Sequence, residues 1–125
     1  MKKVLFYSLI AAVMTVSFAA CGWKPEVSAV PITEPWSSMH LPVQENAVIW
    51  SSGPNQFKAV HKEDKKTILG KYTEALKQQG WTLDKFDDKS SGNIIYLDMT
   101  KGPEKLKIQI YDFQGTGVII DKSVG

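Results

Sequence analysis

Residues 64–81 read DKKTILGKYTEALKQQGW and carry the clearest secondary-structure signal in the chain. Asp64 is a residue type that caps the N-terminus of a helix, because its carboxylate can accept hydrogen bonds from free backbone N–H groups. Gly80 stands where a left-handed C-terminal cap is favoured. Between them the residues of one stripe recur at spacings of three and four, which predicts one amphipathic helix. The stripe consists of Ile68, Tyr72, Ala75, Leu76 and Gln79.

The chain on both sides of this helix contains short apolar and alternating segments, which predict strands. The alternation is cleanest at 105–111, where Leu106, Ile108 and Ile110 share one face. Because the connections are short, neighbouring strands are expected to be antiparallel. The predicted fold is therefore α+β, with one amphipathic helix packed on one face of a mostly antiparallel sheet of about five to six short strands. The expected strands lie at 47–50, 56–61, 81–83, 94–100, 105–111 and 118–120.

The first twenty residues have the features of a secretory signal peptide. Lys2 and Lys3 precede a run without charge, from Val4 to Ala20. A basic start, an apolar run of under about 20 residues and small residues before the break are typical of such peptides. A transmembrane anchor is the second interpretation, since anchors need about 20 apolar residues and are often followed by a basic flank.

The end of this run, Phe18-Ala19-Ala20-Cys21, resembles the lipobox of bacterial lipoproteins, although phenylalanine replaces the usual leucine. The resemblance implies cleavage before Cys21, lipid attachment to its thiol and location in the cell envelope. Gly22 after the cysteine resembles lipoproteins that pass to the outer membrane of Gram-negative bacteria, where they face the periplasm. The alternatives are an ordinary signal peptide with a chance cysteine and a buried free thiol. Cys21 is the only cysteine, so no intramolecular disulfide is expected.

Prolines punctuate the segment that follows, at Pro25, Pro31, Pro35 and Pro42. They disfavour helix interiors and central strands and favour an extended, semi-rigid chain. We therefore divide the sequence into a signal peptide (1–20), a lipid-attachment cysteine with a proline-rich tether (21–46) and a small α+β domain (47–125). Tryptophans do not suit a purely solvated tether: Trp36 is expected to pack back on the domain, and Trp23 to rest at the membrane interface. The other interpretation is that these two tryptophans belong to a docking site for a partner.

The pattern Tyr-x-x-x-Leu-x-x-x-Gly-Trp at 72–81, followed by a meander of strands, carries a second resemblance. It resembles small helix-grip-like modules of envelope lipoproteins, such as those in a lipoprotein subunit of the outer-membrane barrel-assembly machinery. This resemblance implies that Tyr72 and Leu76 are core contacts, that Gly80 caps the helix and that Trp81 folds back under it. It bears on the fold and implies no particular activity.

Charge argues against nucleic acid as a partner. The whole chain has 15 basic and 13 acidic residues, and all of the basic ones are lysine. Removal of residues 1–20 takes Lys2 and Lys3 with it, which leaves 13 basic and 13 acidic side chains. Without arginine or a basic block, the processed chain lacks the features that bind phosphates and bases. The expected partners are the membrane, through the lipid, and an unidentified envelope protein.

No constellation of catalytic or metal-binding residues is evident in the sequence. His40 lies in the tether and His61 ends a strand, and both are expected at the surface without metal-ligand spacing. The serines at 51–52 and 90–91 are expected in turns, and none lies in a nucleophile motif. The carboxylates of Asp84, Asp87 and Asp88 are expected on or beside a solvated turn. We expect no cofactor, no metal and no enzymatic activity.

The solvent face of the predicted sheet has side chains that the fold alone does not require. Polar and aromatic side chains should share the solvent face of the sheet, and tyrosine combines contact area with a polar tip. An ordinary solvated face is the first interpretation, and a face that docks a protein or a glycan is the second. The function expected is that of an accessory or structural envelope lipoprotein; a small-ligand or glycan-binding lipoprotein is the alternative, and a hydrolase comes last. The candidate partner-binding residues are Tyr96, Tyr111, Gln109 and Lys107.

Overall fold

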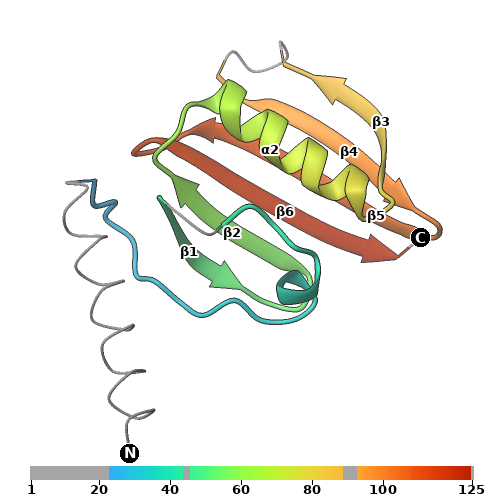
Figure 1. Ribbon diagram of the computed structural model, residues 1–125, viewed down its shortest axis with the longest axis horizontal. Helices are drawn as coiled ribbons and strands as arrows, with labels where there is room; N and C mark the ends of the chain where they lie inside the picture. Colours follow the sequence, from blue (N-terminus) through green and yellow to red (C-terminus); the bar gives the residue numbers. More distant parts are fainter. Residues whose placement is uncertain (1–22, 44–45, 89–92, 125) are drawn as a thin grey trace, which may run out of the picture.

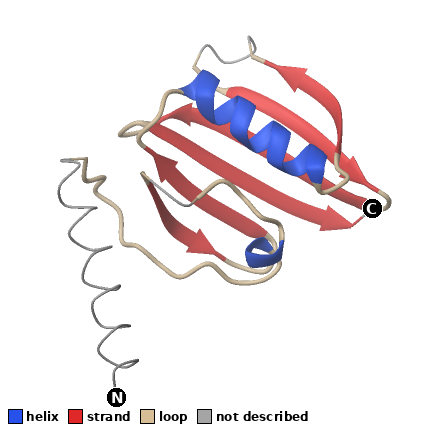
Figure 2. Ribbon diagram, viewed as in Figure 1, coloured by secondary structure: helices blue, strands red, loops and turns tan. Residues whose placement is uncertain are grey.

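The computed structural model describes residues 23–43, 46–88 and 93–124 (Figure 1). Cys21, Gly22 and the residues before them lie outside this part of the chain, as do Ser90 and Ser91. The described chain forms a six-stranded antiparallel sheet with one α-helix, and a short 3-10 helix precedes the sheet (Figure 2). The α+β class and the number of strands are as predicted.

The six strands have the order β1-β2-β6-β5-β4-β3. The last strand along the chain, β6, therefore lies inside the sheet, between the hairpin that precedes the helix and the meander that follows it. Each neighbouring pair is antiparallel, and short turns connect β1 with β2, β4 with β5, and β5 with β6. The strands are β1 (Ala47–Ser52), β2 (Gln56–His61), β3 (Thr82–Asp87), β4 (Ile95–Lys101), β5 (Glu104–Asp112) and β6 (Thr116–Val124).

The helix α2 (Lys65–Gln78) has the ends that its sequence predicts. The Asp64 carboxylate accepts a hydrogen bond of 2.8 Å from the backbone N–H of Thr67. At the other end Gly80 has φ +95°, and its N–H donates to the carbonyl of Lys77, so a left-handed glycine closes the helix. Three members of the predicted stripe are fully buried: Ile68, Tyr72 and Leu76.

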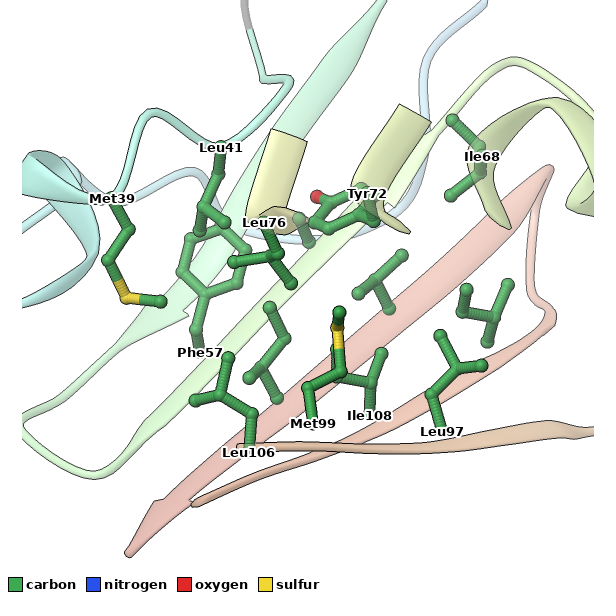
Figure 3. Close-up of a cluster of buried hydrophobic side chains, with 14 of the residues drawn as sticks. Met39, Leu41, Phe57, Ile68, Tyr72, Leu76, Leu97, Met99, Leu106 and Ile108 are labelled. Carbon is green, nitrogen blue, oxygen red and sulfur yellow. The ribbon is translucent and has the colours of Figure 1, made fainter. Parts of the chain in front are cut away.

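One hydrophobic cluster joins these helical side chains to the sheet (Figure 3). Alternate residues of β4 and β5, such as Leu97, Met99 and Ile108, belong to it and are at most 1% exposed. Trp81, directly after the helix, is 5% exposed and belongs to the same cluster. Burial of large aliphatic and aromatic side chains contributes about 1.5–3 kcal/mol each, so a core of this kind is the main stabilising feature of a domain without disulfides.

The proline-rich segment contributes to this core, as expected for Trp36, although the rest of the segment was expected to be a tether. Trp36, at the start of the 3-10 helix η1 (Trp36–Ser38), is fully buried, and Met39 and Leu41 belong to the same cluster. The indole N–H of Trp36 donates to the carbonyl of Gly53 at 2.6 Å. A tryptophan that packs beside Phe57, with ring centroids 5.6 Å apart, outweighs the preference of the prolines for a solvated chain.

The same segment also covers the edge of the sheet at β1. The backbone N–H of Val30 donates to the carbonyl of Ile49 at 2.8 Å, and the N–H of Thr33 donates to the Ser52 hydroxyl at 2.9 Å. An uncovered edge strand offers free backbone groups to other chains. The segment therefore protects β1, whereas β3 forms the other edge of the sheet.

Candidate functional site

The candidate site is the face of the sheet that points away from the buried cluster, which we call the outer face. It consists of the side chains that alternate with the buried ones along the strands, because successive residues of a strand point to opposite sides. None of its members on β4 or β5 is fully buried. On these two strands they are Tyr96, Asp98, Thr100, Lys105, Lys107, Gln109 and Tyr111.

The structure brings the four predicted partner-binding residues together on this face. Tyr96 of β4 lies directly opposite Gln109 of β5. Lys107 and Tyr111 lie two residues before and after Gln109 along β5, so they share its side of the sheet. Tyr96, Gln109 and Tyr111 are half-buried and Lys107 is exposed. The four side chains thus form a continuous patch across two neighbouring strands.

Lys107 lies between two acidic residues on the neighbouring strands. The register places Asp98 of β4 on one side of it and Asp121 of β6 on the other. Asp121 also accepts a hydrogen bond of 2.8 Å from the side-chain amide of Gln56. Opposite charges on adjacent strands stabilise one another and reduce the net potential of the face. This row therefore suits a polar partner of mixed charge better than an isolated anion.

Tyr111 lies flat across β6 at Gly117. A Cβ atom added at Gly117 would come within 2.5 Å of the Tyr111 ring. The glycine therefore leaves the space that lets the ring cover the sheet, and partial burial raises the pKa of the Tyr111 phenol. The ring is packed on the backbone of β6, and the side chain is half-buried.

An aromatic cluster extends the outer face beyond the predicted residues. It consists of Trp50, Tyr111 and Phe113. The ring centroid of Phe113 lies 6.0 Å from that of Tyr111 and 6.2 Å from that of Trp50. The ammonium group of Lys58 lies 4.9 Å from the centre of the Trp50 ring, within the range of a cation–π contact.

The sequence did not reveal this cluster, because its members come from β1, from the end of β5 and from the turn that follows β5. Trp50 lies at a bulge of β1, between Ile49 and Ser51, where the pairing with β2 shifts by one residue. An extra residue of this kind re-aims side chains, and a single sequence gives no signal for it. The only available hint was the number of aromatic residues close to strand ends.

His61 is fully buried, which corrects the expectation of a surface histidine. Its Nε2 atom lies 2.7 Å from the Tyr72 hydroxyl, and the two rings meet edge to face. Burial lowers the pKa of His61 to about 4 and raises that of Tyr72, because both charged forms are disfavoured away from water. The pair is a structural link between β2 and α2, and solvent does not reach it. His40, by contrast, is exposed as expected.

A shallow cleft lies at the start of α2, between residues 62–66 and the turn that connects β5 and β6. Several of its polar groups have partners within the protein. Lys65 forms an ion pair with Asp112 at 3.2 Å, and the Thr116 hydroxyl donates to the carbonyl of Glu63 at 2.6 Å. The Asp64 carboxylate occupies the position at the helix N-terminus that an external anion would take. The cleft is therefore better explained by polar contacts that hold the start of α2 against the turn between β5 and β6.

Two other expectations from the sequence differ from the structure in detail. Ser51 and Ser52 belong to β1 instead of a turn, because they pair with Lys58 and Phe57 of β2. Asp84 and Asp87 belong to β3, and Asp88 follows it; all three carboxylates are exposed. Within the described residues, no three histidine, cysteine or acidic side chains converge as metal ligands would.

Comparisons of the chain with protein-family models, with curated proteins and with solved structures find no match. Among the residues that the structure describes, no helix is long and apolar enough to cross a membrane. The outer face must therefore be interpreted from its own chemistry. It offers half-buried aromatic rings, an amide and a row of alternating charges, which are groups that bind polar and aromatic surfaces.

Proposed function

We propose that the protein is a cell-envelope lipoprotein, anchored through lipid on Cys21, with a small non-catalytic domain that binds another envelope protein. In a Gram-negative host it would lie at the outer membrane and face the periplasm as an accessory or structural subunit of an envelope complex. The order of a basic start, an apolar run, small residues and a cysteine supports the anchor. Two or more acyl chains would give stable attachment, since each buried methylene contributes about 0.8 kcal/mol.

The observation that carries the interaction role is the continuous patch of Tyr96, Gln109 and Tyr111 on the outer face. In this proposal α2 covers the opposite face of the sheet, where its buried side chains join the core, and leaves the outer face open to a partner. Tyrosine is enriched in protein interfaces, and its two side-chain torsions lose little entropy on binding. Two half-buried tyrosines around an amide are a typical centre for such a contact.

A small-ligand or glycan-binding lipoprotein is the second candidate, and the aromatic cluster of Trp50, Tyr111 and Phe113 favours it. Aromatic rings beside the Gln109 amide and the Lys58 ammonium could stack on the apolar faces of sugar rings. A thermal shift of the domain with envelope glycans, reduced by Trp50→Ala, would support this candidate. A hydrolase is the least supported candidate, because His61, which lies beside the Tyr72 hydroxyl, is fully buried in the core.

The anchor is tested by metabolic labelling with a fatty acid in cells that process the precursor. Cys21→Ala should abolish lipid incorporation and leave the precursor uncleaved. Cys21→Ser is the matched control for size, and it should behave in the same way because a hydroxyl replaces the thiol. Normal labelling of either variant would contradict lipid attachment at Cys21.

The partner face is tested by site-specific photo-crosslinking in intact cells. A crosslinker at Gln109, on the outer face, should capture an envelope protein in a discrete adduct. The matched control places the same crosslinker at Glu74, which is exposed on α2. An adduct at position 109 that disappears with Tyr96→Ala supports the proposal. Equal adducts at both positions, or none at position 109, would contradict it.

A further inference from the structure

The chain enters the domain at a defined place, beside the turn between β5 and β6. The indole N–H of Trp23 donates to the backbone carbonyl of Gln114 at 2.8 Å, and the side-chain amide oxygen of Gln114 accepts a hydrogen bond from the N–H of Glu26. Gln114 has a left-handed backbone conformation in this turn, with φ +51°. Figure 1 shows the described chain beginning at the end of the sheet where this turn lies.

Very little chain separates this docking point from the lipid. Only Gly22 lies between Cys21 and Trp23, so the two Cα atoms that flank it can be at most about 7 Å apart. The extended tether expected from the sequence, residues 21–46, could have reached roughly 85 Å. Because Trp23, Val30 and Trp36 contact the domain, this segment cannot extend to that length.

From this geometry we infer that the bilayer surface is itself a partner of the domain, which it holds in one orientation with the β5–β6 turn toward the lipid. The inference rests on the proposed function, because it requires lipid on Cys21. Two side chains at this end, Trp23 and Phe113, have the aromatic character that is favoured at the membrane–water interface. Lys24 follows Trp23 in the chain, and Lys62 and Lys66 line the cleft beside the β5–β6 turn together with Glu63, Asp64 and Asp112. Long lysine side chains can reach lipid phosphates while their stems stay on the protein.

The orientation also fixes which parts point away from the membrane. Residues 53–55, the turn between β4 and β5 and the end of β6 lie at the opposite end of the sheet (Figure 1). Lys62 and Asn55 flank β2 and are seven positions apart in the chain, so the ends that they mark are about 23 Å apart. With the strands leading away from the bilayer, the outer face stands at the side of the domain, where a neighbouring envelope protein in the same membrane can reach it.

The test uses the full-length lipidated protein with one added cysteine. Because acylation consumes the thiol of Cys21, an introduced cysteine is the only site that a thiol-reactive fluorophore can label. Lys62→Cys marks the end expected at the lipid, and Asn55→Cys marks the opposite end; both side chains are exposed. Each labelled protein is reconstituted in phosphatidylethanolamine–phosphatidylglycerol vesicles that carry a nitroxide quencher on the lipid headgroup. Fluorescence quenching and flotation with the vesicles are both measured.

The label at position 62 should be quenched several-fold more strongly than the label at position 55. Insertion of sixteen Gly and Ser residues between Gly22 and Trp23 should reduce this ratio toward one, because such a linker spans roughly 20–24 Å. Flotation with equal quenching at both positions, or with stronger quenching at position 55, would overturn the orientation and leave the lipoprotein proposal standing. Failure of the wild-type protein to float would overturn the anchor, and the orientation with it.

Discussion

Acid should destabilise this domain through one buried side chain, His61. The pKa of its imidazole is 6.5 in an exposed reference state and about 4 in the fold. Burial is the largest cause; Glu63 raises the pKa and Lys71 lowers it by charge. In addition, Nδ1 of His61 is buried with no hydrogen-bond partner among the described residues, so a proton there would find no acceptor. The folded state therefore favours the neutral ring.

The sign and size of the effect follow from proton linkage. The folded-state pKa lies below the unfolded one, so the unfolded chain binds more protons between these values. The contribution of His61 to stability is fully present above about pH 6.5 and is lost as the pH falls toward about 4. Between about pH 7.5 and about pH 5 this side chain alone should lower the free energy of unfolding by about 2 kcal/mol.

The assay compares urea unfolding of the wild-type domain and of His61→Gln across this pH range. Glutamine cannot titrate, and its amide can still form a hydrogen bond with the Tyr72 hydroxyl. His61→Gln should be less stable near neutral pH, but its stability should depend less on pH by about 2 kcal/mol over the same interval. His40→Gln is the matched control, because His40 is exposed, and it should keep the wild-type dependence.

Carboxylates add their own acid dependence, which both proteins share. A hydrogen bond from the Thr67 backbone lowers the pKa of Asp64, and a hydrogen bond from Lys122 lowers that of Glu104. Their stabilisation is lost only as the pH falls through these lowered values, so the difference between wild type and variant isolates His61. Parallel stability curves for the two proteins, or an NMR titration of His61 near its ordinary pKa, would refute the reasoning.

Three further predictions concern the core, the outer face and the helix start. Trp36→Ala should lower the free energy of unfolding by about 3–5 kcal/mol in a urea titration, since the ring is fully buried beside Phe57; a loss below about 0.5 kcal/mol would mean that this segment does not belong to the folded domain. Gly117→Ala should lower stability by about 1–3 kcal/mol because the new methyl group displaces the Tyr111 ring, and the loss should be smaller when measured in a Tyr111→Ala background. Asp64→Ala should lower the melting temperature through loss of about 1 kcal/mol of capping energy, whereas Asp64→Asn should retain most of it; equal losses would argue that charge alone stabilises this helix end.

The parts of the fold that were predicted correctly are those with local causes. The helix could be placed from Asp64 and Gly80, because capping involves residues within one turn. The core side of β5 could be read from Leu106, Ile108 and Ile110, because alternation is a property of a single strand. The shared face of Tyr96 and Gln109 followed from the same alternation.

What escaped prediction depends on contacts that are distant in sequence. The burial of His61 requires the helix to fold back over the end of β2, so a histidine at a strand end gave no sign of it. The packing of Trp36 on the domain was expected, but the burial of Met39 and Leu41 was not, because the composition of this segment is that of a tether. The aromatic cluster needs a bulge at Trp50 and a turn at Phe113 to meet, which local patterns do not encode.

The place of β6 in the sheet has a consequence for how the protein is made. It pairs with β2 on one side and β5 on the other, yet it follows both along the chain. A nascent chain that ends before Thr116 contains an isolated β1–β2 hairpin and a separate β3–β4–β5 meander, and no hydrogen-bonded ladder joins them. The sheet can close only when the last strand has left the ribosome. Until that moment the chain remains a substrate for chaperones and proteases.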